Sequence, residues 1–202
     1  TDPEDVARVL CAQEIPVSGQ VCSSLTRVIV SRRRHDALVE ALAARFRAVR
    51  VGDPFDPQTE MGPLATRRQL ERVQGYVARG IADGATLAAG GRRPAHLERG
   101  HYLEPTVFGN VPPDSTIATE EIFGPVLSVT VARDQDEAIA IANGTPYGLN
   151  ASVFTRNVDQ AYAIARRLRA GTVGHNEFRS DFLLGMGGFK QSGIGREGGV
   201  EG

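Results

Sequence analysis

The sequence of 202 residues is poor in the residue types that build disulfide frameworks, metal cages and basic surfaces. Its two cysteines, Cys11 and Cys22, are too few for a disulfide framework or a metal cage, which fits a reducing compartment. The formal net charge of −1 provides no electrostatic footprint for nucleic acid. No apolar run approaches the ~20 residues of a membrane span. These absences predict a cytoplasmic protein with no nucleic-acid, membrane or metal partner.

Lysine is almost absent, because 22 of the 23 basic residues are arginine and Lys190 is the single lysine. An ammonium and a guanidinium group are not interchangeable at a tight site, so position 190 is a candidate for a site that requires a compact cation. Chance survival of one lysine is the alternative. Glycine, in contrast, is abundant, with 23 residues in the chain. Such a content predicts many tight turns and close backbone approaches.

Hydrophobic periodicity predicts helices and strands that alternate along the chain. Helical patterns cover residues 2–12, 35–49, 65–82, 135–143 and 159–168, and strand patterns cover residues 27–30, 86–89, 126–131, 151–155 and 172–173. Pro105 makes residues 102–111 an extended segment near a sheet edge. The alternation predicts an α/β fold with a largely parallel, twisted sheet and flanking helices. Residues 1–202 are interpreted as one domain, in which the Gly-rich residues 174–202 form a functional loop and tail.

Cys22 lies in the short segment SGQVCSS, among small and hydroxyl-bearing residues. If Val21–Leu25 begins a helix, the helix dipole and the free N–H groups favour the Cys22 thiolate and make it reactive. A buried, inert thiol is the commoner role of a lone cysteine and stays open as the alternative. Cys11 lies in an apolar helical pattern and is assigned the structural role.

The segment EEIFGPVL, residues 120–127, places two acids before an aromatic residue, a Gly-Pro turn and a strand. A carboxylate there can accept hydrogen bonds from sugar hydroxyls, although a solvated helix end before a turn explains the same residues. The four histidines lack the spacing of metal ligands. A hydrolase dyad of Cys22 and His175 is a further alternative, because such partners are often distant in sequence.

Five segments in order, SGQVCSS, EEIFGPVL, YGLNASVFT, AGTVGHN and GGFKQSGIGRE, resemble the NAD(P)-dependent aldehyde dehydrogenase superfamily over nearly the whole chain. The chain looks like the C-terminal half of such an enzyme, which contains the catalytic-cysteine domain and lacks the N-terminal cofactor domain. The resemblance implies oxidation of a small aldehyde to a carboxylic acid with NAD or NADP, through a thiohemiacetal and a thioester on cysteine. It also implies a homo-oligomeric parent enzyme.

The resemblance carries roles to individual positions. Cys22 takes the place of the nucleophile in the Gly-Gln-x-Cys motif, and its backbone N–H becomes one oxyanion donor. Glu121 matches the glutamate that binds the nicotinamide ribose, and Phe123 matches the aromatic residue beside that ribose. The candidates for substrate binding lie in the loop that follows residue 176, and they are Phe178, Phe182 and Met186. Lys190 is expected to support the site structurally.

Several family features have no counterpart in these residues, namely the Gly-rich cofactor turn, the general-base glutamate and the oxyanion asparagine. The isolated chain is therefore expected to be inactive. Family members often carry an aromatic residue where Met186 stands, which leaves the shape of the tunnel open. Retention of the Glu-x-Phe-Gly-Pro pattern favours a simple dehydrogenase over a CoA-acylating relative. A non-catalytic fragment or interaction module that keeps the fold is the remaining alternative.

Overall fold

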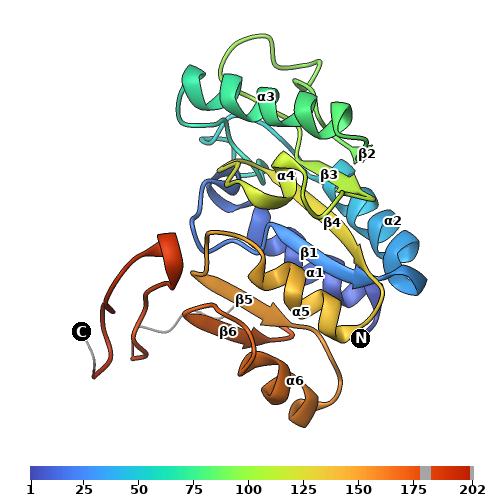
Figure 1. Cartoon of the computed structure of the whole chain (residues 1–202). Helices are drawn as coiled ribbons and strands as arrows, with labels where there is room; N and C mark the ends of the chain where they lie inside the picture. Colours follow the sequence, from blue (N-terminus) through green and yellow to red (C-terminus); the bar gives the residue numbers. More distant parts are fainter. Residues whose placement is uncertain (178–182, 201–202) are drawn as a thin grey trace.

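Helices and strands alternate in the computed structural model, which describes residues 1–177 and 183–200 (Figure 1). The helices are α1 (Pro3–Glu14), α2 (Arg32–Ala48), α3 (Arg67–Ala82), α4 (Thr116–Thr119), α5 (Gln135–Asn143) and α6 (Val158–Ala165), with two short 3-10 helices, η1 (Pro16–Gly19) and η2 (Lys190–Ser192). The strands are β1 (Arg27–Ser31), β2 (Thr86–Ala89), β3 (Thr106–Gly109), β4 (Val126–Ala132), β5 (Asn150–Val153) and β6 (Thr172–His175). This alternation confirms the predicted α/β class.

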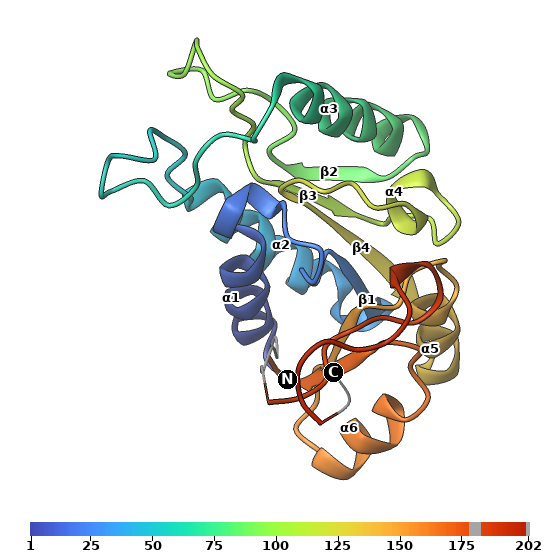
Figure 2. The same cartoon turned by 90° about the vertical axis from the view of Figure 1, so that its left-hand side faces the viewer.

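The described strands form two sheets. The larger sheet has the order β1-β4-β3-β2, and the smaller sheet pairs β5 with β6. The β1–β4, β3–β4 and β5–β6 pairs are parallel, whereas β2 and β3 are antiparallel. Parallel pairing therefore dominates, as predicted, but the described strands form two sheets where a single sheet was predicted. Figure 2 shows α1 and α2 on one side of β1 and α5 on the other, so that helices flank the sheet on both faces.

Strand β3 lies inside the larger sheet, so the prediction that residues 102–111 lie near an edge is wrong. The strand pairs with β2 on one side and β4 on the other, and all four of its residues are buried. Pro105 stands immediately before the strand, where its missing N–H interrupts no ladder. The ladder starts at Thr106, whose N–H donates to the Pro125 carbonyl at 2.8 Å.

Helix α3 packs on the larger sheet, and its apolar face shares a core cluster with Phe108 of β3 and Val126 of β4. Thr66 caps the helix, because its hydroxyl accepts a hydrogen bond from the Gln69 N–H at 3.1 Å. Apolar side chains one turn apart then face the core, and they are Leu70, Val73 and Val77.

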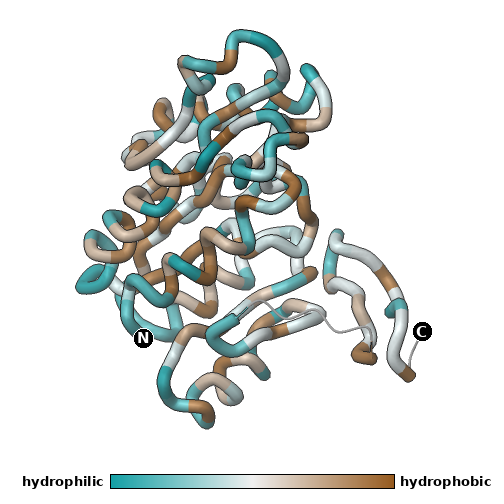
Figure 3. The backbone as a smooth tube through the Cα atoms, turned by 180° about the vertical axis from the view of Figure 1, so that it is seen from behind, coloured by the Kyte–Doolittle hydropathy of each residue, from teal (hydrophilic) through white to brown (hydrophobic). Residues whose placement is uncertain are grey.

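Along the helices of the chain, hydrophobic and hydrophilic positions alternate (Figure 3). Within residues 1–177 and 183–200, no helix has the length and apolarity that crossing a membrane requires.

Candidate active site

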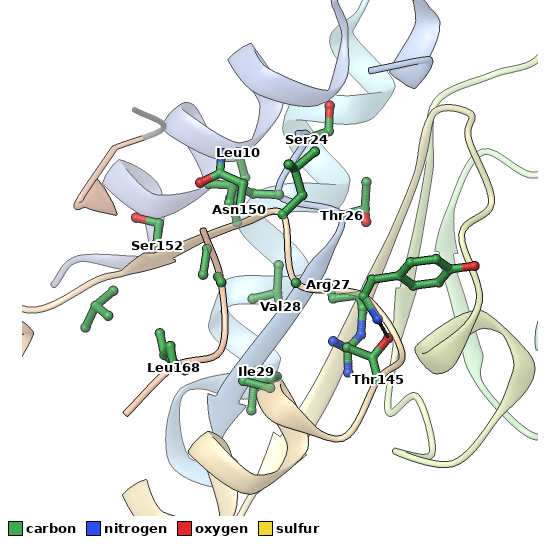
Figure 4. A pocket seen from close by; sticks show the side chains of 18 of the residues that line it. Leu10, Ser24, Thr26, Arg27, Val28, Ile29, Thr145, Asn150, Ser152 and Leu168 are labelled. Carbon is green, nitrogen blue, oxygen red and sulfur yellow. Dashed lines mark hydrogen bonds between the residues drawn. The ribbon is translucent and has the colours of Figure 1, made fainter. Parts of the chain in front are cut away.

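A cavity of about 620 Å³ lies between the facing strands β1 and β5. Figure 4 shows Val28 and Ile29 from β1 and Asn150 and Ser152 from β5 around it. Its volume lies within the range of small-molecule sites. The Asn150 side-chain amide also donates to the Ser23 carbonyl at 3.1 Å, which ties β5 to the turn that contains the candidate nucleophile.

Residues from distant segments share the wall of this cavity. Cys22 lies on it, and so do Glu121 and Phe123 from the segment before β4. The fold thus brings the candidate nucleophile and the candidate cofactor-binding residues to one cavity. Within the described residues, no group of three or more histidine, cysteine, aspartate or glutamate side chains is arranged to hold a metal ion.

Cys22 lies in an exposed turn between η1 and β1. The hypothesis that Val21–Leu25 begins a helix is wrong, because the turn leads through an extended stretch directly into β1. Pairing of this stretch with β4 begins where the Ser128 N–H donates to the Thr26 carbonyl at 2.9 Å, and a helix would forfeit that pairing. The Cys22 backbone N–H donates to none of the described residues.

The turn before Cys22 has an unusual backbone. Val17, Ser18 and Gly19 are three consecutive residues in the left-handed region, with φ of 52°, 56° and 69°. This conformation costs roughly 1–2 kcal/mol for a residue with a Cβ. The Ser18 hydroxyl lies 2.9 Å and 3.2 Å from the carbonyl oxygens of Gly62 and Pro63, and this contact helps to hold the turn.

Two glycines allow three elements to stack closely at the site. A Cβ on Gly19 would lie 2.5 Å from the carbonyl carbon of Gly124. A Cβ on Gly124 would in turn lie 2.5 Å from a methyl group of Val73 on α3. The Cys22 turn therefore rests on the segment that carries Phe123, and that segment rests on α3. Any side chain at either glycine would push these elements apart.

The two adjacent carboxylates before β4 have different environments. Glu120 accepts a hydrogen bond from the Tyr76 hydroxyl at 2.7 Å, which ties it to α3. The Glu121 side chain lies exposed on the cavity wall, and its carboxylate accepts no hydrogen bond from the described residues. Phe123, with φ of 59°, is 37% exposed beside it. Glu121 is therefore the carboxylate that is left to accept hydrogen bonds from the hydroxyls of a ligand.

Sequence reasoning missed the side chains of α3 that hold this segment, namely Gln69, Arg72 and Tyr76. Their partners in residues 120–123 are distant in the sequence, so no local motif reveals the pairing. The only signal was the presence of polar residues three and four positions apart on an amphipathic helix.

The predicted substrate residues are not tested by this geometry. Phe178 and Phe182 lie outside the described residues. Met186 is 39% exposed and pairs with Glu197 through two backbone hydrogen bonds of 2.7 Å. It does not lie on the wall of the cavity, so its role in substrate binding stays a prediction.

His175 and Cys11 are the other residues to which the sequence assigned a hydrolase role or a structural role. The His175 Nε2 atom lies 2.8 Å from the Thr155 carbonyl oxygen, and no hydrogen bond joins His175 to Cys22. The hydrolase dyad therefore has no support among these contacts. Burial raises the pKa of the half-buried Cys11 thiol, which agrees with a structural role.

Lys190 holds the end of α5. Its ammonium group donates to the carbonyl oxygens of Asn143 at 2.7 Å and Thr145 at 2.8 Å. Burial, together with the charges of Arg169 and Arg27, lowers the pKa of Lys190. Two carbonyls that converge on one nitrogen suit a compact ammonium better than a planar guanidinium, which agrees with the structural role expected for this single lysine.

Comparisons with known proteins agree with these observations. The model of the aldehyde dehydrogenase family matches residues 1–202. Betaine aldehyde dehydrogenases of Brucella anthropi and Brucella melitensis are 46% and 45% identical to the chain over 186 residues, which are 91% of this chain and 38% of each relative.

Solved structures are also similar. The aldehyde dehydrogenase of Mycobacterium tuberculosis complexed with NAD+ has a TM-score of 0.96 and 42% identity, and the match covers 100% of this chain and 42% of that chain. The betaine aldehyde dehydrogenase of Staphylococcus aureus in complex with NAD+ has a TM-score of 0.95 and 38% identity, with 100% and 41% covered. The chain thus spans about two fifths of the length of these relatives. It belongs to the aldehyde dehydrogenase family.

Proposed function

We propose that residues 1–202 form the catalytic part of an NAD(P)-dependent aldehyde dehydrogenase in which Cys22 is the nucleophile. The observation that carries this proposal is the packing of the Cys22 turn on the segment of Glu121 and Phe123, where a Cβ on Gly19 would lie 2.5 Å from the Gly124 carbonyl carbon and where all three residues line one cavity. Family membership supports the reaction class. One structure of the Staphylococcus aureus betaine aldehyde dehydrogenase contains a BME-modified cysteine, which supports a reactive thiol in this family.

The reaction begins at the Cys22 thiolate, which adds to the carbonyl carbon of the aldehyde and forms a thiohemiacetal. The backbone N–H of Cys22 stabilises the oxyanion that this addition creates. When bound, NAD(P) supplies the acceptor for the hydride that leaves the thiohemiacetal carbon. The aldehyde carbon is thereby oxidised, and a thioester remains on Cys22. Water cleaves the thioester, which releases the carboxylic acid and restores the thiol.

Glu121 and Phe123 bind the nicotinamide riboside portion of the cofactor in this proposal. Glu121 offers a carboxylate without a partner among the described residues, and such a group accepts hydrogen bonds from a pair of ribose hydroxyls. Phe123 offers a partly exposed apolar ring beside it. The neighbouring Glu120 is less suited, because Tyr76 already donates to its carboxylate. The hydrogen-bond acceptor of Glu121 and the apolar ring of Phe123 thus fit the nicotinamide riboside that the family implies.

The remaining functions are assigned to other parts of the parent enzyme, meaning the complete enzyme that contains these residues. The Gly-rich nucleotide turn, the general base for the water and the oxyanion asparagine lie there in our proposal. Residues 1–202 alone therefore do not oxidise aldehydes. We further propose a cytoplasmic, homo-oligomeric parent, in which the segment predicted as the substrate loop and tail, residues 174–202, takes that role after its first two residues have completed β6.

The substrate is a small aldehyde, with Phe178, Phe182 and Met186 as candidate contacts. Betaine aldehyde is the first compound to test, because relatives that are 45% and 46% identical carry that name. Aromatic side chains suit its quaternary ammonium group, since the face of an aromatic ring attracts a cation.

The test is formation of NADH by the parent enzyme, followed by absorbance with betaine aldehyde and a series of aliphatic aldehydes. Cys22→Ala should lower kcat/KM by at least ~1,000-fold, because no other group forms the thioester. Cys11→Ser is the matched control and should retain the activity of the wild type. A Cys22→Ala enzyme that keeps more than about a tenth of the wild-type rate would refute the proposal.

A further inference from the structure

One face of α3 carries three polar side chains, Gln69, Arg72 and Tyr76, at spacings of three and four residues. Side chains with this spacing lie above one another on a helix. All three reach the same segment, residues 120–123, which contains both candidate cofactor-binding residues. Helix α3 therefore contacts every residue of this segment, from Glu120 to Phe123.

At one end of the segment, the contacts form a linked network. The Tyr76 hydroxyl donates to the Glu120 Oε2 atom at 2.7 Å and accepts from the Arg72 Nη2 atom at 3.0 Å. The same Arg72 nitrogen donates to the Glu121 carbonyl oxygen at 2.7 Å. The Arg72 guanidinium group also lies 5.0 Å from the centroid of the Tyr76 ring, which is a cation–π contact. The Tyr76 hydroxyl thus orients the Arg72 guanidinium group, which in turn holds the Glu121 backbone carbonyl.

At the other end, Gln69 holds the residue with the strained backbone. Its Nε2 atom donates to the Ile122 carbonyl oxygen at 3.2 Å and to the Phe123 carbonyl oxygen at 2.6 Å. Phe123 has φ of 59°, a conformation that persists only where the surroundings impose it. Four consecutive residues therefore receive a hydrogen bond from α3, one of them on its side chain and three on their carbonyl oxygens.

We propose that Tyr76 is a positioning residue for the cofactor: through Glu120 and Arg72 it sets where the Glu121 carboxylate and the Phe123 ring stand, without itself touching the nucleotide. This inference rests on the cofactor-binding role proposed above for Glu121 and Phe123. It assigns the two adjacent carboxylates separate tasks, because Glu120 anchors the segment and Glu121 serves the ligand.

The chemistry of Tyr76 suits this task. Its side chain is only 6% exposed, so the ring is fixed by packing and phenylalanine can replace it with little loss of packing. Burial and the hydrogen bond to Glu120 raise the pKa of Tyr76, so the hydroxyl keeps the proton that it donates. Removal of the hydroxyl leaves Glu120 and Arg72 without their shared partner.

The test measures KM for NAD+ and kcat in the parent enzyme at saturating aldehyde. Tyr76→Phe should raise KM for NAD+ about tenfold and leave kcat within about twofold, since the thiol chemistry at Cys22 is unchanged. A merely structural role would instead reduce the amount of active enzyme and leave KM unchanged. Tyr162→Phe is the matched control, because Tyr162 is 66% exposed and its hydroxyl bonds to none of the described residues.

A double variant tests the linkage. Once Tyr76→Phe is present, Glu120→Ala should raise KM for NAD+ no further, because each change removes one partner of the same hydrogen bond. Additive increases, or an unchanged KM in Tyr76→Phe, would overturn the proposal.

A measurement that needs no activity separates this inference from the proposed function. In the 202-residue chain, NMR amide signals of residues 121–123 should shift in Tyr76→Phe and stay in place in Tyr162→Phe. If the wild-type parent forms no NADH with any aldehyde, the proposed function fails, while these signals still decide whether Tyr76 positions the segment. Unshifted signals in Tyr76→Phe would show that it does not.

Discussion

Gly19→Ala is the substitution that most directly probes how the site is assembled. Gly19 has φ of 69°, and a residue with a Cβ pays roughly 1–2 kcal/mol for this conformation. The new Cβ would also lie 2.5 Å from the Gly124 carbonyl carbon and oxygen and 2.6 Å from the Pro125 nitrogen. These are backbone atoms that cannot rotate away, and such overpacking costs typically about 1–3 kcal/mol. The expected loss in the free energy of unfolding is therefore about 2–5 kcal/mol.

Urea unfolding measures this loss from the midpoint and slope of the transition. Gly84→Ala is the matched control, because Gly84 has φ of 89° and a Cβ there would meet nothing within 4 Å. It carries the backbone cost without the clash, so it should lose only about 1–2 kcal/mol. In the parent enzyme, Gly19→Ala should also reduce kcat/KM, because the Cys22 turn moves away from Phe123. Equal losses of stability in the two variants would refute the stacking argument.

Three further predictions concern the buried and reactive groups. Burial raises the pKa of the fully buried Glu14 well above its ordinary value, so the free energy of unfolding falls as pH rises through that raised pKa. Glu14→Gln should remove this fall, and urea unfolding near pH 5 and pH 8 should show a larger advantage of the variant at the higher pH. Iodoacetamide should alkylate the exposed Cys22 at least about tenfold faster than the half-buried Cys11, as peptide mass spectrometry can measure. His35 is buried and its Nε2 atom accepts a hydrogen bond from the Asn110 N–H at 2.9 Å, so His35→Ala should cost about 2–4 kcal/mol in urea unfolding.

Elements with a strong local pattern were predictable from the sequence. The helix expected over residues 65–82 is found at Arg67–Ala82, and the strand expected over residues 126–131 is found at Val126–Ala132. The helix is recognised by the period of its apolar residues, whereas the strand is recognised by its largely apolar, β-branched composition and is buried on both faces. The position of β3 was not predictable in this way, because an interior strand and an edge strand differ in their pairing partners and not in their own residues.

Some features of the candidate site were also predictable from the sequence, and others were not. The motif around Cys22 and the segment with Glu121 were identified by resemblance, and the fold places both on one cavity wall. The local conformation at Cys22 was predicted wrongly, because pairing of the following strand with β4 outweighs the weak helical tendency of a few residues. The contacts of Tyr76 were not predicted at all, since a hydrogen bond to Glu120 joins residues 44 positions apart.

The central claim is that Cys22 carries the covalent intermediate, and trapping that intermediate tests it most directly. The parent enzyme is mixed with NAD+ and aldehyde, quenched with acid within one turnover, and digested for mass spectrometry. The account predicts that the peptide containing Cys22 gains the mass of the acyl group, and that the peptide containing Cys11 does not. NADH formation with an unmodified Cys22, or with the acyl group on another residue, would contradict it.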